Sequence, residues 1–108
     1  MKNDKVPELT NHKFEDFIKE GFVLIDFFAE WCMPCLVIAP IIDELSEKFK
    51  GKIKFGKVNV GENKEIAQKF DVSSIPNFIL FKDGKQIEQF VGSVSKEEFE
   101  ERLKKFIE

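Results

Sequence analysis

The two cysteines of this chain, Cys32 and Cys35, are the residues best suited to do chemistry. They form a Cys-x-x-Cys between the apolar, strand-like run Phe22–Ala29 and a helical pattern, a placement typical of a dithiol that opens and closes a disulfide. A bridge between them would enclose only four residues and would remove little entropy from the unfolded chain. A chemical use of the pair is therefore favoured over a structural one.

The expected position of the pair, at the start of a helix, predicts different tasks for the two sulfurs. Cys32 should lie near the N-cap, where backbone N–H groups lack intrahelical partners and the helix dipole is positive, which lowers the pKa of its thiol and activates it as a nucleophile. Pro34 fits the first turn, where its missing N–H costs nothing. Cys35, one turn in, should be less exposed and suited to resolving a mixed disulfide.

Two other interpretations of the cysteines are weaker. A zinc site needs two further ligands, and His12 is the only histidine, so we expect no metal. A buried, inert pair is disfavoured because Trp31 and Pro34 flank the cysteines at a strand-to-helix turn.

Asp26 is the next most informative residue, because its carboxylate lies within a run of apolar side chains. Desolvation there should raise its pKa, and the group could pass a proton to or from Cys35 through a water. Lys57 shares a strand face with Ile53 and Phe55 and is the expected partner. A paired core aspartate with only a structural task remains the alternative.

The rest of the chain alternates strand and helix patterns. We expect a three-layer α/β/α sandwich: a mixed sheet of about five strands, with four helices on its two faces and the cysteines at the carboxyl end of the central strand. The expected strands are 5–10, 22–29, 53–60, 78–81 and 87–91, the last two joined by Asp83-Gly84, and the expected helices start near Thr10, Cys32, Asn63 and Ser95. Gly21 and Gly51 should end the first two helices, Pro40 should kink the second, and Ser95 with Glu98 should form a capping box.

Length and composition predict one domain over residues 1–108. A net charge of −3 without a basic block argues against nucleic acid, and no run is long enough to span a bilayer. The polar start leads into no apolar signal segment, so we expect a cytoplasmic protein. We also expect the protein to be a monomer.

One set of residues, spread over essentially the whole chain from Val23 to Gly92 and including Trp31-Cys32-x-Pro34-Cys35 and Ile75-Pro76, resembles the pattern of the thioredoxin family. The matching positions are Val23, Asp26, Phe27, Ala29, Trp31, Cys32, Pro34, Cys35, Pro40, Lys57, Ile75, Pro76, Phe81, Lys82, Gly84 and Gly92. The resemblance implies the thioredoxin fold and a thioredoxin-type protein-disulfide reductase, a thiol-disulfide oxidoreductase in which Cys32 attacks, Cys35 resolves and Asp26 assists proton transfer. It also implies two kinds of partner: disulfide-containing protein substrates, and a separate thioredoxin reductase that supplies the electrons. No cofactor besides the cysteine pair is expected.

The resemblance further implies a binding surface around the cysteines. The bond before Pro76 would be cis and would stack against the pair, and the Ile75 backbone would hydrogen-bond an extended substrate segment. Trp31, Met33, Val91 and Gly92 would complete a shallow apolar surface. Ordinary packing would also account for the apolar residues except Trp31, whose place beside the cysteine pair favours a function.

Three departures from the usual family pattern bear on partner choice rather than on disulfide chemistry. Met33 replaces a glycine, Leu36 a lysine and Asn77 the threonine that usually follows the cis proline. An oxidase or isomerase role in disulfide formation is the alternative within the same chemistry. A binding subunit without redox turnover is the alternative from another class, and a glutaredoxin role is disfavoured because no glutathione-binding features are recognisable.

Overall fold

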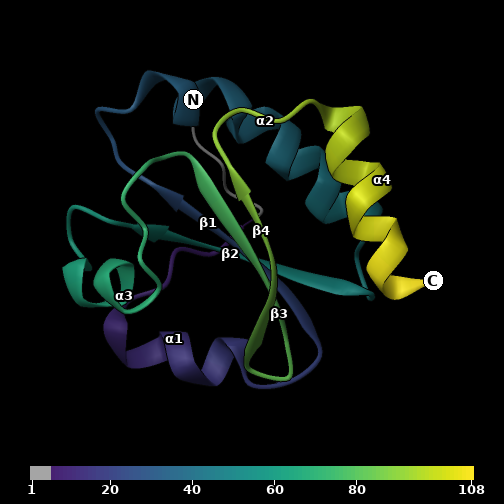
Figure 1. Ribbon diagram of the computed structural model, residues 1–108, viewed down its shortest axis with the longest axis horizontal. Helices are drawn as coiled ribbons and strands as arrows, with labels where there is room; N and C mark the ends of the chain where they lie inside the picture. Colours follow the sequence, from purple (N-terminus) through teal and green to yellow (C-terminus); the bar gives the residue numbers. More distant parts are fainter. Residues whose placement is uncertain (1–5) are drawn as a thin grey trace.

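The computed structural model describes residues 6–108, which form a four-stranded sheet with four helices (Figure 1). In chain order the elements are α1 (Asn11–Ile18), β1 (Phe22–Phe28), α2 (Met33–Lys48), β2 (Ile53–Asn59), α3 (Lys64–Lys69), β3 (Asn77–Lys82), β4 (Lys85–Val91) and α4 (Lys96–Ile107). The strand order is β2-β1-β3-β4, with β1 parallel to β2 and β3 antiparallel to both β1 and β4. The predicted mixed sheet is confirmed.

The sheet has an apolar core on each face, which explains why β1 lacks a polar–apolar alternation. Leu24 faces the core that includes side chains of α2 and α4, whereas Val23, Ile25 and Phe27 face the core beneath α1 and α3. Figure 1 shows the two pairs of helices on opposite sides of the sheet. The predicted three-layer arrangement is therefore correct.

The expected first strand is wrong as a strand. Within the described residues it reduces to a single parallel bridge between Glu8 and Lys57, and Lys5 lies outside the part that is described. Lys57 donates its N–H to the carbonyl of Pro7 (3.0 Å) and accepts from the N–H of Leu9 (2.8 Å). Pro7 has no N–H of its own to extend the ladder. The described sheet thus has four strands rather than about five.

The β3–β4 hairpin turns at Asp83-Gly84, as predicted. Both residues have positive φ (51° and 85°), which a type I′ turn requires. The Asp83 carboxylate also accepts a hydrogen bond from the N–H of Gly21 (2.8 Å), so the hairpin is fastened to the segment between α1 and β1. Gly21 has a positive φ but lies beyond the end of α1 at Ile18.

The helix ends show which capping predictions hold. Ser95 Oγ accepts from the N–H of Glu98 (3.1 Å), but the Glu98 carboxylate accepts from Arg102 instead of completing the capping box. Asn63 is the N-cap of α3, yet its side-chain amide donates to the carbonyl of Asn59 (3.0 Å). Helix α2 continues from Met33 to Lys48 with Pro40 inside it.

None of the helices within residues 6–108 is both long and apolar enough to cross a membrane.

Candidate active site

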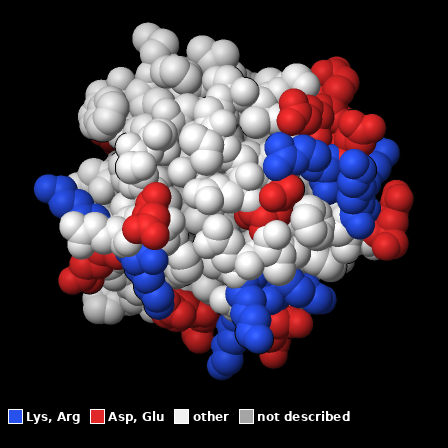
Figure 2. Space-filling view, viewed as in Figure 1, with Lys and Arg blue, Asp and Glu red and all other residues white. Residues whose placement is uncertain are grey.

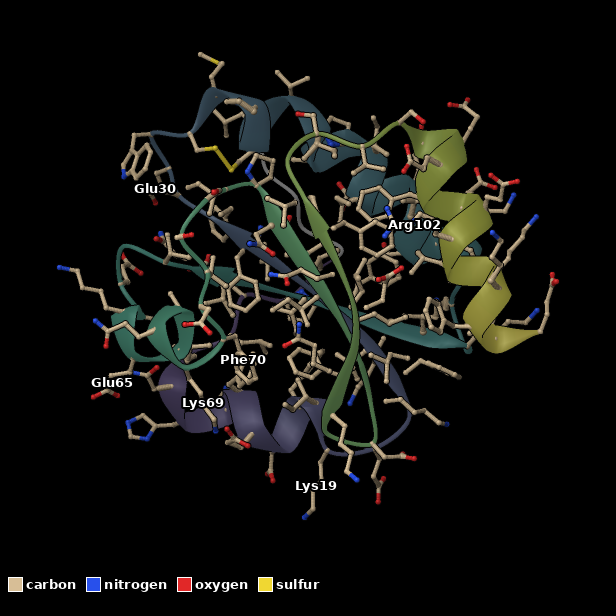
Figure 3. The ribbon with its side chains drawn as sticks, viewed as in Figure 1. Lys19, Glu30, Glu65, Lys69, Phe70 and Arg102 are labelled. Atoms are coloured by element: carbon tan, nitrogen blue, oxygen red, sulfur yellow. A yellow bond between two sulfur atoms is a disulfide. The ribbon has the colours of Figure 1, made fainter. Side chains whose placement is uncertain are left out.

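The Cys-x-x-Cys lies where β1 passes into α2. Cys32 is the N-cap residue of α2, and Met33, Pro34 and Cys35 form its first turn. The two cysteines are joined by a disulfide, with their Cα atoms 5.3 Å apart (Figure 3). Cys32 Sγ also accepts a hydrogen bond from the N–H of Cys35 (3.3 Å). The predicted N-cap position of Cys32 is confirmed.

The disulfide is enclosed by apolar side chains. Ala29 forms a small buried cluster with both cysteines, against which Phe28, Val60 and Ile75 pack. Each cysteine is only 5 % exposed, so the expectation that Cys35 is the less exposed of the two is wrong for this oxidised form. Because the two sulfurs are bonded to each other, both cysteines belong to the same buried cluster.

Residues 74–76, here called the docking loop, lie beside the disulfide. The Ile75–Pro76 bond is cis, and Ile75 packs against the cysteine cluster. The carbonyls on either side of Ile75 are both held: Ser74 accepts from the Asn77 side-chain amide (3.2 Å), and Pro76 accepts from the N–H of Gly92 (2.8 Å). Ile75 itself has neither its N–H nor its C=O hydrogen-bonded within residues 6–108. This leaves one donor and one acceptor open next to the sulfurs.

Exposed apolar side chains surround the turn. The large ones near the cysteines in sequence are Trp31, Met33, Leu36 and Val37, and Val91 ends the strand next to the docking loop. Trp31 is 78 % exposed, which ordinary packing does not explain for an indole. Charged side chains gather along the right, lower and left edges of the molecule in Figure 2, and few are seen in the centre of this face.

Asp26 lies on β1 beneath α2, on the same sheet face as Leu24. It is 6 % exposed, and its Oδ1 has no hydrogen-bond partner within the described residues. Burial raises the pKa of Asp26 to about 7, an effect that the positive charge of Lys57 partly opposes. Lys57 is the direct β2 neighbour of Asp26, and its Nζ lies 5.6 Å from the centre of the Phe28 ring. Lys57 is therefore the strand neighbour of Asp26, and the pKa of Asp26 is raised in the direction that desolvation predicts.

Comparison with known proteins identifies the family. Residues 5–105 match the family model described as Thioredoxin. This chain belongs to the thioredoxin family. It is 41% identical over 102 residues to a thioredoxin of Staphylococcus saprophyticus (94% of this chain, 98% of the relative). It is 44% identical over 89 residues to one of Chlamydia pneumoniae (82% of this chain, 86% of the relative). The crystal structure of oxidised mitochondrial thioredoxin 3 from Saccharomyces cerevisiae superimposes with a TM-score of 0.86 at 30% identity and covers 95% of this chain and 97% of its own.

As a thioredoxin, the chain is a thiol-disulfide oxidoreductase that exchanges a dithiol for a disulfide through its Cys-x-x-Cys pair. Thioredoxins act on protein substrates and are served by a reductase, and that general statement holds here. Among residues 6–108, no three histidine, cysteine, aspartate or glutamate side chains come together as they would to hold a metal ion. His12 is exposed on α1.

The structure brings most of the predicted site residues together from three separate segments. Residues 31–35 lie at the junction of β1 and α2, and residues 75–76 precede β3. Residues 91–92 lie at the end of β4, where Val91 pairs with Asn77 of β3. The sequence pattern did not point to Val60, which packs against the cysteine cluster, or to Val37, an exposed apolar residue of α2. Val60 directly follows β2, and only the parallel pairing of β1 and β2 places it near the cysteines.

Proposed function

We propose that this thioredoxin works as a protein-disulfide reductant in which Cys32 is the nucleophile. The Cys32 thiolate attacks one sulfur of a substrate disulfide, that bond breaks, and the second substrate sulfur leaves as a thiolate that takes a proton. Cys35 then loses its proton and attacks Cys32 Sγ, which forms the Cys32–Cys35 disulfide and releases the first substrate sulfur. Two electrons pass to the substrate in total. Each substrate sulfur leaves as a thiolate and takes up a proton from solvent, which balances the two protons that Cys32 and Cys35 have lost.

The observation that carries this assignment is the N-cap position of Cys32. Its sulfur accepts from the N–H of Cys35 at the positive end of α2, where a thiolate is stabilised before attack. The Cys35 N–H is the donor in this bond, and the Cys35 sulfur lies one turn into the helix. The chemistry therefore favours Cys32 for attack and Cys35 for resolution.

Asp26 is proposed to accept the proton of Cys35 during resolution. A carboxyl group whose pKa is about 7 can both take up and release a proton near neutral pH. The Asp26 side chain lies below α2, and its Oδ1 has no competing hydrogen bond within the described part of the chain. Lys57 would limit the rise of that pKa and so hold it close to neutrality.

Ile75 is proposed to bind the substrate backbone. Its open N–H and C=O can each hydrogen-bond an extended peptide, as in strand addition, while Trp31, Met33 and Val91 contact apolar side chains. Gly92 supports this surface by holding the Pro76 carbonyl. Methylating the substrate amide nitrogen that faces Ile75 should slow reduction of a cystine-bridged peptide, and an unchanged rate would exclude this mode of docking.

The partners follow from the direction of electron flow. Disulfide-containing proteins would accept electrons, and a separate thioredoxin reductase would replace them, since no nucleotide-binding motif is present in the sequence. We place the protein in the cytoplasm as a monomer that forms one domain over residues 1–108. A single close cysteine pair, without further bridges, suits a reducing compartment.

Trapping the mixed disulfide tests the two cysteine roles. A Cys35→Ser variant should form a stable adduct with a disulfide-containing protein through Cys32, because no thiol remains to resolve it. Cys32→Ser should form none. Adducts of equal yield from both variants would overturn the assignment.

A further inference from the structure

Asn77 is a buried polar residue at the start of β3 and has no part in the mechanism proposed above. It is 2 % exposed, and its side chain makes two hydrogen bonds. Its Nδ2 donates to the carbonyl of Ser74 in the docking loop (3.2 Å), and its Oδ1 accepts from Nε2 of Gln89 on β4 (3.0 Å). The amide therefore joins the docking loop to the edge strand of the sheet.

The main chain of Gln89 is itself held in place by the side chains of Glu88 and Arg102. Its N–H donates to Glu88 Oε1 (3.1 Å), and its carbonyl accepts from Nη2 of Arg102 at 3.5 Å. Arg102 also pairs with Glu88 (2.9 Å) and stacks over the ring of Phe90, with its guanidinium carbon 4.1 Å from the ring centre. Figure 3 labels Arg102 on α4, beside β4. The Gln89 side chain therefore extends from a stretch of main chain that Arg102 of α4 holds in position.

The two hydrogen bonds of Asn77 act on the part of the site that is proposed to read a substrate backbone. The Ser74 carbonyl precedes Ile75 directly, so a shift of Ser74 reorients the peptide plane whose N–H is open for substrate. The Pro76 carbonyl on the other side is held by Gly92. Without Asn77, the docking loop would be anchored on one side only.

We propose that Asn77 and Gln89 are positioning residues for disulfide exchange with protein substrates. Gln89 fixes the Asn77 amide, Asn77 fixes Ser74, and Ser74 orients the Ile75 backbone for an extended substrate segment. This role rests on the proposed docking at Ile75. Since neither side chain reaches the sulfurs in the described contacts, chemistry on a substrate without a peptide backbone does not depend on the pair.

The test compares two substrates, a cystine-bridged peptide and hydroxyethyl disulfide, which has no peptide backbone. Asn77→Ala should lower kcat/KM for the peptide about fivefold to tenfold, mainly through KM, and leave the rate with hydroxyethyl disulfide within about twofold of wild type. Gln89→Met keeps the length of the side chain at a partly exposed position and replaces the amide that donates to Asn77 Oδ1 with an apolar thioether. It therefore tests the proposal even if Asn77→Ala folds poorly. Its effect should be in the same direction and smaller.

The chain offers a matched control for each variant. Asn63 is likewise buried and donates its amide to a backbone carbonyl, that of Asn59, so Asn63→Ala has a similar structural cost away from the docking loop. Gln86→Met alters an exposed glutamine of the same strand, β4. Both controls should reduce both substrates at wild-type rates.

Three outcomes would overturn the positioning role. The first is a wild-type rate with the peptide in both Asn77→Ala and Gln89→Met. The second is an equal loss with both substrates, which would make the pair merely structural. The third is a wild-type protein that is indifferent to N-methylation of the peptide, which would remove the proposed docking and this role with it. If wild type is sensitive to N-methylation and the variants behave as wild type, only the positioning role fails.

Discussion

Asp26 and Lys57 lie opposite one another in neighbouring parallel strands, beneath the helix whose N-terminus carries the disulfide. The pair places an ionisable carboxyl group in an apolar core, with one cation beside it. Burial raises the pKa of Asp26 and Lys57 opposes the rise, with the result at about 7. The relationship between these two side chains has consequences for the stability of the protein, for the rate of the resolving step and for the pKa of Asp26.

Asp26→Asn should stabilise the oxidised protein at alkaline pH. The pKa of Asp26 rises from 3.8 in its reference state to about 7 in the fold, so the folded state binds more protons than the unfolded chain between these values. Stability therefore falls as pH rises through this window and levels off above it, with a total cost of at most roughly 4 kcal/mol. The variant lacks this cost and should have the higher free energy of unfolding at about pH 8 and nearly the wild-type value at about pH 4.

Urea unfolding of the oxidised proteins at several pH values measures this effect. Asp16→Asn, which removes an exposed carboxylate from α1, should show no comparable gain at high pH. If Asp26→Asn and wild type differ by the same amount at every pH, the buried ionisation is not the cause.

The same substitution should slow the resolving step. Without a carboxylate to accept the proton of Cys35, release of the substrate should be about tenfold slower, a modest loss for a general base because water can replace it in part. The wild-type rate should rise through about pH 7 as Asp26 ionises, and the variant should lose this inflection. Stopped-flow kinetics at several pH values measure both; identical pH profiles would leave Asp26 with a structural task alone.

Lys57→Met should raise the pKa of Asp26 above its value of about 7, because it removes a positive charge that favours the ionised carboxylate. An NMR titration of the Asp26 side-chain carbon measures the change directly. Lys54→Met removes a lysine of the same strand whose Nζ lies over the ring of Phe17. This variant should leave the pKa of Asp26 unchanged. A downward movement in Lys57→Met would contradict the assigned partnership.

Trp31→Ala should weaken reduction of protein substrates without destabilising the fold. The indole is 78 % exposed, so its removal should change the free energy of unfolding by less than about 0.5 kcal/mol. The loss should fall mainly on KM for a protein disulfide, several-fold in size, since the side chain is proposed to contact substrate. Ile87→Ala, a change at another exposed apolar residue, is the matched control. An unchanged KM in Trp31→Ala would remove the indole from the docking surface.

Gly56→Ala should destabilise the protein by overpacking. A Cβ at this position would lie 2.9 Å from both Leu9 Cδ1 and Phe17 Cε2, and the site is buried, so about 1–3 kcal/mol of stability should be lost. In a double-mutant cycle with Leu9→Ala, the combined loss should be smaller than the sum of the single losses, because the shorter side chain makes room. Additive losses would show that Leu9 is not the obstacle.

The sequence was sufficient for those features that depend on local chemistry. The apolar run of β1, the Asp83-Gly84 turn and the N-cap position of Cys32 each follow from residues adjacent in the chain. The direction of the Asp26 pKa change also followed, because a carboxylate among apolar neighbours is desolvated in any two-sided sheet.

Features that depend on tertiary contacts could not be predicted in this way. Nothing in the sequence near Gln89 indicates that its amide reaches Asn77, since the contact depends on the register of β3 and β4. The two cysteines are equally exposed, at 5 % each, in the disulfide-bonded form, and the sequence specifies neither that exposure nor the oxidation state. The expected first strand is only one bridge within the described residues, because Pro7 lacks the N–H donor that a longer ladder requires.

The most direct test of the proposed function is the reduction of insulin disulfides by dithiothreitol, followed by the turbidity of the released B chain. The wild-type protein should accelerate the reaction strongly at micromolar concentration, and Cys32→Ser should leave it at the rate of dithiothreitol alone. No acceleration by the wild type, or equal acceleration by Cys32→Ser, would contradict the conclusion that this chain reduces protein disulfides through Cys32.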